Sequence, residues 1–317
     1  MADRKPAQPA RSEALSPSGV AAGASGNAMA SIHETDSPMG ADLPFTKMHG
    51  AGNDFVVLDG LRDALPPIEP LAARLCDRHL GIGADQLLVV RPGSGADFRM
   101  EIWNADGSQV EMCANGIRAF YKYLRDHGLT SRDEIGVETL SGVVRPRWAG
   151  TDRVTVDMGP PVLAPEKIPT TLASGEGPVL DVPLEVEGET LSVSCASMGN
   201  PHAVVFVADP DATPVERWGR AIEHHPAFPN RTNVEFVSVV DRGRIAQRTW
   251  ERGAGETLAC GSGACAVAVV SMLRGVVDRA VRIALRGGTL EISWPDDRAH
   301  VEMTGPAAEV FTGRIRI

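Results

Sequence analysis

The sequence has few aromatic residues and no long apolar segment, and both shortages limit what the protein can be. Aromatic residues make up 5% of the 317 residues whereas 43% are hydrophobic, so a core must be built mainly from Val, Ile, Leu and Ala. The longest apolar run lies within residues 264–273 and is about half of the roughly 18 residues that a membrane span needs. The net charge of -10 and the lack of a polybasic stretch argue against binding to nucleic acid or to an anionic membrane.

Paired cysteines are also missing. The chain has an odd number of cysteines, and no two of them form a C-x-x-C motif. This pattern argues against a disulfide framework and against a zinc site, so we expect no bound metal and a reducing, cytoplasmic location. The cysteines are Cys76, Cys113, Cys195, Cys260 and Cys265.

The N-terminal segment differs in composition from the rest. Residues 1–42 are rich in Ala, Ser, Pro and Gly and have almost no large apolar side chains, so we predict a disordered tail. The remaining chain alternates between strand and helix patterns. Predicted strands cover residues 54–60, 85–90, 98–105, 153–159, 189–199, 202–207, 233–240 and 244–252; predicted helices cover 69–80, 116–128, 214–225 and the segment after Cys260.

Several features recur at a fixed separation of 147 residues. Cys113 in "EMCANG" and Cys260 in "LACGSG" share the form C-x-x-G before a helix, and 260 minus 113 is 147. The same offset joins Asn53 to Asn200, Gln86 to Asn233 and Asn104 to Glu251. Because any insertion would break this spacing, we predict two halves of like fold related by a pseudo-twofold axis, with one cysteine on each wall of a central cleft.

The position of these two cysteines suggests their chemistry. A helix N-terminus has unpaired N–H groups and partial positive charge, which favour a thiolate and attract a carboxylate. Such termini commonly lower a thiol pKa from its ordinary value near 8.5, so we expect one thiolate to act as a base near neutral pH. Two thiols facing one carbon from opposite sides would invert its configuration. For any single cysteine core packing is the ordinary interpretation, and we assign that role to Cys76, Cys195 and Cys265.

Six sequence blocks resemble diaminopimelate epimerase. They are "MHGAGNDFVVLD", "GIGADQ", "WNADGSQVEMCANGIR", "GNPHAV", "NRTNVEFV" and "WERGAGETLACGSGACA", and the likeness runs from about Phe45 to the C-terminus. The resemblance implies an α/β (α+β) fold of two domains, each a curved mixed or antiparallel sheet or barrel around a central helix, with the active site in the cleft between them. The expected division is 43–160 plus 305–317 for one half and 161–304 for the other.

The resemblance also implies a function. The chain would be an isomerase that converts LL- to meso-diaminopimelate, a small-molecule substrate, in lysine and peptidoglycan precursor synthesis, without a cofactor and as a homodimer. Cys113 and Cys260 match the two acid/base thiols, and His202 and Glu251 match positions that tune them. The matching substrate-binding positions are Asn53, Gln86, Asn104, Ala114, Asn115, Asn200, Asn233, Glu251, Arg252, Gly261 and Ser262.

The residue types suit such a substrate. Asparagine amides recognise the distal amino acid end, Arg252 offers a bidentate fork to a carboxylate, and Glu251 accepts from an ammonium group. Singly, each of these residues is more ordinarily a turn residue, a strand end or a surface ion pair. Two positions depart from the family pattern: Ala114 stands where glycine is usual and Ser262 where threonine is common. We expect neither change to abolish activity.

Other functions stay open at this point. Proline-type racemases have a histidine two residues past the first cysteine, where this chain has Asn115. A pyridoxal phosphate racemase needs a Schiff-base lysine, and none of the few lysines has a suggestive context. A thiol hydrolase using Cys260 and His202 leaves Cys113 unexplained. A relative acting on another amino acid and a non-catalytic amino acid binder are further alternatives.

Overall fold

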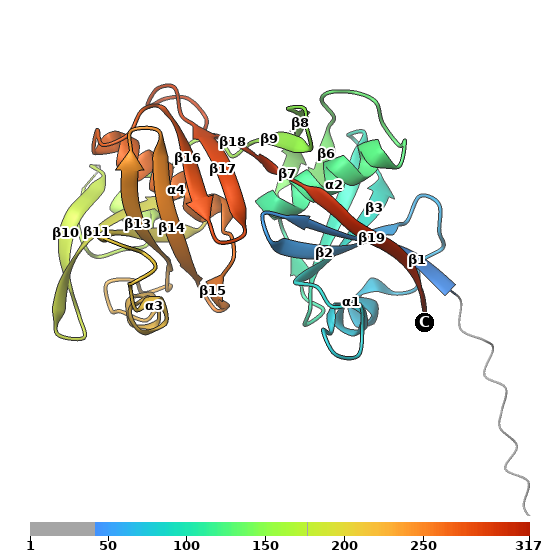
Figure 1. The fold of residues 1–317 in the computed structure, drawn as a ribbon, viewed down its shortest axis with the longest axis horizontal. Coiled ribbons are helices and arrows are strands. Elements are labelled where there is room, and N and C mark those ends of the chain that lie inside the picture. The colour runs from blue at the N-terminus through green and yellow to red at the C-terminus, as the bar shows by residue number, and fades with distance from the viewer. Residues whose placement is uncertain (1–41, 176) are drawn as a thin grey trace, which may run out of the picture. The chain divides into compact units, whose positions relative to one another are not determined.

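The computed structural model describes residues 42–175 and 177–317, which form two β-sheets of eight and eleven strands with four α-helices (Figure 1). No helix in this part of the chain is long and apolar enough to cross a membrane. The predicted disordered tail, residues 1–42, lies outside the described residues except for Asp42, which begins the first strand.

The first sheet has the strand order β19-β1-β2-β3-β4-β6-β7, with β5 paired to β4. Its strands β1, β2, β3 and β4 contain the buried apolar segments, as the Val- and Leu-rich patterns predict for β2 and β3. Their bounds are Asp42–Gly50 (β1), Asn53–Asp59 (β2), Gln86–Pro92 (β3), Phe98–Asn104 (β4), Gln109–Val110 (β5), Val137–Thr139 (β6), Gly142–Val144 (β7) and Ala308–Arg316 (β19).

The second sheet has the order β10-β11-β12-β13-β14-β16-β17-β18-β9-β8, with β15 paired to β14. Their bounds are Arg147–Trp148 (β8), Arg153–Asp157 (β9), Val179–Val186 (β10), Glu189–Ser197 (β11), Pro201–Phe206 (β12), Asn233–Asp241 (β13), Arg244–Glu251 (β14), Gly255–Thr257 (β15), Ala280–Leu285 (β16), Gly288–Ser293 (β17) and Glu302–Pro306 (β18). A short 3₁₀ turn covers Pro165–Lys167.

The two sheets repeat one topology. In the first, β1–β2 is antiparallel, β2–β3 parallel, β3–β4 antiparallel, β4–β6 parallel and β6–β7 antiparallel. The series from β11 to β17 has the same alternation. The helices repeat at the predicted offset of 147 at both ends: α1 (Ile68–Cys76) corresponds to α3 (Val215–Glu223), and α2 (Ala114–Asp126) to α4 (Gly261–Leu273). The prediction of a duplicated fold is confirmed.

Each sheet packs around one central helix. Helix α2 contacts β1, β2, β3, β4, β9 and β19, and α4 contacts β11, β12, β13, β16 and β17; Figure 1 shows α4 among the strands of the second sheet. Helix α4 is apolar on almost every side, and it is buried along most of its length. Burial of a helix on all sides explains why its sequence lacks the polar face of a surface helix.

One predicted helix is too long. We expected a helix over residues 69–80, but α1 ends at Cys76. The Asp77 carboxylate accepts hydrogen bonds from the backbone N–H groups of His79 and Leu80, both at 2.7 Å, and this local turn replaces further helical bonds.

Candidate active site

The two cysteines at matched positions both line one cavity of about 1690 Å³. Most of the predicted substrate-binding residues line it too. They are Asn53, Gln86, Asn104, Ala114, Asn115, Asn200, Glu251, Gly261 and Ser262.

Cys113 is the N-cap residue of α2. Its backbone is extended, and its Sγ accepts a hydrogen bond from the Gly116 N–H at 3.4 Å. The sulfur also lies 3.6 Å from Asn53 Oδ1, to which the thiol donates. The helix thus begins on a sulfur that satisfies one of its unpaired N–H groups.

Cys260 has the same position at α4. Its Sγ accepts from the Gly263 N–H at 3.3 Å and lies 3.5 Å from Ser262 Oγ. The side chain is buried, whereas Cys113 is half-buried. Both C-x-x-G motifs therefore build the cap that the sequence predicts.

The N-termini of α2 and α4 meet. The Asn115 amide in the first turn of α2 donates to the Ala259 carbonyl just before α4, at 3.3 Å. A Cβ added at Gly261 would lie 3.2 Å from the Ala114 methyl group, so only a small side chain fits at this contact. Ala114 is accommodated because the residue that it faces, Gly261, has no side chain.

Burial controls the acidity of both thiols. Desolvation raises the pKa of Cys113 above its ordinary value, although the N–H groups of Gly116 and Asn115 counteract it. For Cys260, burial and then the negative charge of Glu251 raise the pKa well above that value, against hydrogen bonds from Ser262 and Gly263. Hydrogen bonds from the helix N-terminus do lower the pKa, as expected, but desolvation exceeds their effect, so the prediction of a lowered thiol pKa is wrong.

The surroundings of the two thiols differ. A Cβ at Gly116 would contact the Cys113 Cβ, Leu88 and Phe55 at 3.3 to 3.5 Å. At the matching Gly263, an added Cβ would collide with the Glu235 carboxylate. Counted by the 147-residue offset, Phe55 and Leu88 correspond to His202 and Glu235. An apolar pair beside one thiol is thus replaced by a polar pair beside the other.

That polar pair forms a buried chain of hydrogen bonds. His202 Nδ1 lies 2.8 Å from Glu235 Oε1, and both side chains are fully buried. His202 Nε2 lies 3.1 Å from Asn200 Oδ1. Since an amide oxygen only accepts, Nε2 carries a proton in this arrangement.

Glu251 lies at the end of β14, where the sequence places it. Thr257 Oγ1 donates to its Oε1 at 2.5 Å. Burial, opposed by this hydrogen bond, raises the pKa of Glu251, and the nearby Glu235 adds to the increase. A cationic partner would stabilise the ionised form of this carboxyl group, which lies beside the cavity.

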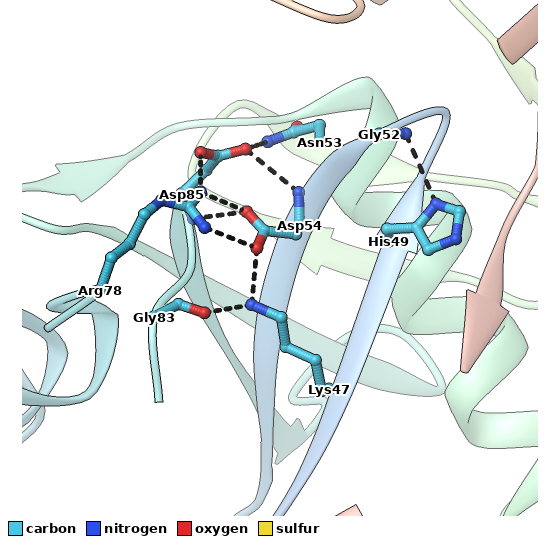
Figure 2. A network of polar contacts seen from close by, with 8 residues as sticks. All are labelled: Lys47, His49, Gly52, Asn53, Asp54, Arg78, Gly83 and Asp85. Atoms are coloured by element: carbon cyan, nitrogen blue, oxygen red, sulfur yellow. Dashed lines mark hydrogen bonds and ion pairs between the residues drawn. The ribbon is translucent and has the colours of Figure 1, made fainter. Parts of the chain in front are cut away.

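The amide side chains form an interlocked set. Asn53 Oδ1 accepts from Asn115 Nδ2 at 3.3 Å, while Asn53 Nδ2 donates to Asp85 Oδ2 at 2.7 Å (Figure 2). Gln86 Nε2 donates to Asn104 Oδ1 at 3.0 Å. The Gln86 oxygen is buried without a hydrogen-bond partner, so this edge of the cavity retains an acceptor that a ligand donor can satisfy.

Three predicted residues do not line the cavity. His202 lies behind Asn200, as described above. Asn233 is buried and ties two backbone segments together, because its Nδ2 donates to the Pro201 carbonyl at 2.8 Å and its Oδ1 accepts from the Arg252 N–H at 2.9 Å. The Arg252 guanidinium donates to the Asn230 carbonyl at 3.1 Å. Direct contact of these side chains with substrate stays a prediction.

Within residues 42–175 and 177–317, one group has the composition of a metal site. The ligand atoms of His202, Glu235 and Cys260 all lie within 4.8 Å of one another. The His202–Glu235 hydrogen bond already pairs two of them. The structure thus joins two of these three groups to each other beside the Cys260 sulfur.

Sequence reasoning missed two carboxylates, Glu235 and Asp85. Glu235 is fully buried in β13, within the apolar run "NVEFVSVV", where a lone acidic residue was the available signal. Asp85 precedes β3 in the block "GIGADQ" and binds Asn53. Both lie inside blocks that resemble the family, but neither matches a position to which the resemblance assigns a role.

Comparisons with known proteins agree on one family. A family profile described as "Diaminopimelate epimerase" matches residues 45–164 and 194–310. Diaminopimelate epimerase 1 of Nostoc sp. is 50% identical over 277 residues, covering 86% of this chain and 99% of that protein. Diaminopimelate epimerase of Moorella thermoacetica is 51% identical over 276 residues, covering 86% and 98%.

Solved structures share the fold at low identity. A phenazine biosynthesis protein of the PhzF family from Bacillus anthracis has a TM-score of 0.65 and 14% identity, covering 87% of this chain and 100% of that one. A probable proline racemase from Agrobacterium radiobacter has a TM-score of 0.63 and 16% identity, covering 87% and 93%. The expected two-domain fold is confirmed.

The contact between Gly263 and Glu235 gives a stability prediction. We expect Gly263→Ala to lower the free energy of unfolding by about 2 kcal/mol, because the added methyl group displaces a buried carboxylate that cannot leave its histidine. The matched variant Gly116→Ala meets more tolerant apolar neighbours and should cost less than about 1 kcal/mol. Urea unfolding of both variants checks this, and equal losses would contradict it.

The thiol environments predict an order of alkylation. We expect iodoacetamide to modify Cys113 first in the native protein, because Cys76, Cys195 and Cys265 are buried with pKa values raised to about 12. The Cys113 rate should rise about tenfold per pH unit through neutrality, since its raised pKa leaves mostly thiol there. Peptide-resolved mass spectrometry provides the measurement. Rapid modification of Cys195 or Cys265 while the protein stays folded would refute the packing assignment.

Proposed function

The chain belongs to the diaminopimelate epimerase family, and from that premise we propose that Cys113 and Cys260 are the two acid/base groups that act on opposite faces of the substrate Cα. The enzyme is an isomerase of diaminopimelate in lysine biosynthesis. One observation carries the assignment of residues: the two sulfurs cap the two symmetry-related helices, and both line the same cavity.

In the proposed reaction, one thiolate removes the Cα proton and the opposite thiol donates its own proton to the other face. The first sulfur ends as a thiol and the second as a thiolate, so the proton count is unchanged and the configuration is inverted. The N–H groups at the starts of α2 and α4 lie beside the sulfurs, where they stabilise negative charge on a thiolate or on the substrate carboxylate. No cofactor is required in this scheme.

Glu251 links substrate binding to thiol acidity. Its negative charge raises the pKa of Cys260 and also contributes to the raised pKa of Cys113. A substrate ammonium group bound to Glu251 would offset that charge and make a thiolate easier to form. We propose that the substrate itself thereby activates the base, which explains how thiols that burial keeps protonated can react.

The remaining residues are proposed to recognise the substrate. Diaminopimelate has two amino acid ends, and the cavity walls offer amide groups from Asn53, Asn104 and Asn200 and a buried acceptor from Gln86. Ser262 keeps a hydroxyl group 3.5 Å from Cys260. Arg252 and Asn233, which do not line the cavity, are proposed to act by holding the loop after β14.

The thiol hydrolase alternative is less well supported. It requires His202 to act as base toward Cys260, but both ring nitrogens of His202 are engaged, one by Glu235 and one by Asn200. Asn115 occupies the position where proline-type racemases have histidine, and it binds the backbone before α4. These contacts favour the epimerase assignment.

Three further expectations belong to the proposal. We propose that one half of the fold consists of residues 43–160 plus 305–317 and the other of residues 161–304. Strand β9 contacts both halves, because it pairs with β18 while α2 packs on it.

The free state of all five cysteines supports a cytoplasmic location. We also propose a homodimer, and the exposed Val310 and Phe311 on β19 are candidates for its interface.

Removal of either thiol should stop epimerisation. We expect Cys113→Ala and Cys260→Ala each to reduce turnover of LL-diaminopimelate by about 10³-fold or more, because each thiol serves one face. Turnover and solvent deuterium incorporation at Cα, measured in deuterated water without added cofactor, provide the test. The control is Cys265→Ala, one helical turn and a half further along α4, which should retain turnover at some cost in stability. Substantial turnover in either single variant would refute the two-base assignment.

The dimer is tested separately. Light scattering on the purified full chain should give twice the mass of 33.6 kDa, and Phe311→Lys should shift it toward the monomer because burying an unpaired charge is costly. A monomeric wild-type chain would exclude the homodimer without affecting the thiol assignment.

A further inference from the structure

A network of charged side chains stands behind Asn53 (Figure 2). Asp85 accepts from Asn53 Nδ2 at 2.7 Å through one oxygen, and its other oxygen pairs with Arg78 at 2.7 Å. Arg78 also binds both oxygens of Asp54, at 2.7 and 3.0 Å. Lys47 completes the network by donating to Asp54 Oδ2 at 2.6 Å and to the Gly83 carbonyl.

This network immobilises the Asp85 carboxylate. The backbone N–H of Asp54 donates to Asp85 Oδ2 at 3.1 Å, and the backbone N–H of Asp85 donates to Asp54 Oδ1 at 2.9 Å. Two carboxylates and two cations balance in charge. Burial alone would raise the pKa of Asp54, but hydrogen bonds from Arg78 and Lys47 outweigh it and hold that pKa well below its usual range.

An ionised carboxylate only accepts hydrogen bonds, and this decides the orientation of an amide beside it. Only the Nδ2 group of Asn53 can bind Asp85. The carbonyl end of Asn53 must then point the other way, where it lies 3.6 Å from Cys113 Sγ and 3.3 Å from Asn115 Nδ2. With an acceptor in front of it, the Cys113 sulfur has a partner for its S–H proton.

We propose that Asp85 is a positioning residue: by binding the amino end of Asn53 it keeps the carbonyl end toward Cys113 and so presents an acceptor, not a donor, at this wall of the cavity. The inference rests on the proposed role of Cys113 as one of the two reacting thiols. Its consequence is that Cys113 is held in the thiol form, ready to act as an acid, because a hydrogen bond to the neutral form favours it.

The described residues of the second half contain no counterpart to this network. Counted by the 147-residue offset, Asp85, Asp54 and Arg78 correspond to Thr232, Pro201 and His225, which cannot form it. There the matching Asn200 is held by its oxygen, through His202 Nε2 at 3.1 Å. The charged network behind Asn53 therefore gives Cys113 an acceptor whose orientation is fixed, and Cys260 has no matching group in the described part of the chain.

The test is the alkylation of Cys113 in Asp85→Asn. An amide at position 85 can bind either end of Asn53, so Asn53 can turn its amino group toward the sulfur and favour the thiolate. We expect Cys113 in the substrate-free protein to react with iodoacetamide about fivefold faster at neutral pH, with its pH profile moved to lower pH. The Cys260 rate, measured by mass spectrometry in the same sample, should not change.

Two controls separate positioning from a change of charge. Asp77→Asn removes a charge from the same cavity rim without contact to Asn53, and it should leave the Cys113 profile unchanged. Asn53→Ala removes the acceptor, so it should also speed Cys113, and the double variant with Asp85→Asn should be no faster than Asn53→Ala alone. If Asp85→Asn does not fold, Asn53→Ala decides: an unchanged Cys113 rate overturns the proposal.

Other results would also overturn it. Three results would show that Asp85 does not act through Asn53. They are an unchanged Cys113 pH profile in folded Asp85→Asn, an equal shift of that profile in Asp77→Asn, and an equal shift of the Cys260 profile.

In turnover assays, Asp85→Asn should lower kcat/KM about tenfold, and Asp85→Glu should recover part of the loss. Failure of the wild-type protein to epimerise diaminopimelate would refute the proposed function alone, because the alkylation rates are measured without substrate.

Discussion

The contact between two helix N-termini is the constraint on which the site depends. Helices α2 and α4 begin against each other, with the Ala114 methyl group facing Gly261 and the Asn115 amide bound to the Ala259 carbonyl. Each helix begins on a sulfur that accepts one of its N–H groups. The duplicated fold therefore does more than repeat a core. It brings two cysteines, 147 residues apart in the chain, to one cavity, and it gives each an N–H donor from the first turn of its helix.

The two halves of the fold are alike, but the two faces of a chiral carbon are not equivalent. The two thiols therefore need surroundings that differ. The structure breaks the symmetry behind the thiols. Phe55 lies near Cys113, whereas its counterpart His202 binds Glu235 beside Cys260. Both thiols have a raised pKa from burial, but only Cys260 also has Glu235 among the charges that raise it. One scaffold thus places two thiols in different electrostatic surroundings.

The sequence could predict what depends on spacing. The helices after Cys113 and Cys260 follow from the two C-x-x-G motifs at the 147-residue offset and are confirmed. The buried carboxylates could not be predicted, because their partners lie on neighbouring strands. Asp85 reaches Asn53 since β2 and β3 run parallel with Phe55 opposite Gln86, a register that no local pattern specifies. The thiol pKa was predicted in the wrong direction because the amount of burial is a property of the folded cavity.

The matched asparagines show how a duplicated site can bind an unsymmetrical group. Asn53 is held by its amino end through Asp85, and it turns its carbonyl toward Cys113, which lines the cavity. Asn200 is held by its carbonyl end through His202, so its amino end is the one that remains for the cavity. The two walls then offer an acceptor and a donor from the same residue type. An amino acid carries an ammonium group and a carboxylate on one carbon, and it needs one of each. In the proposed reaction, two matched amides fixed by opposite ends would orient a substrate that has no such symmetry.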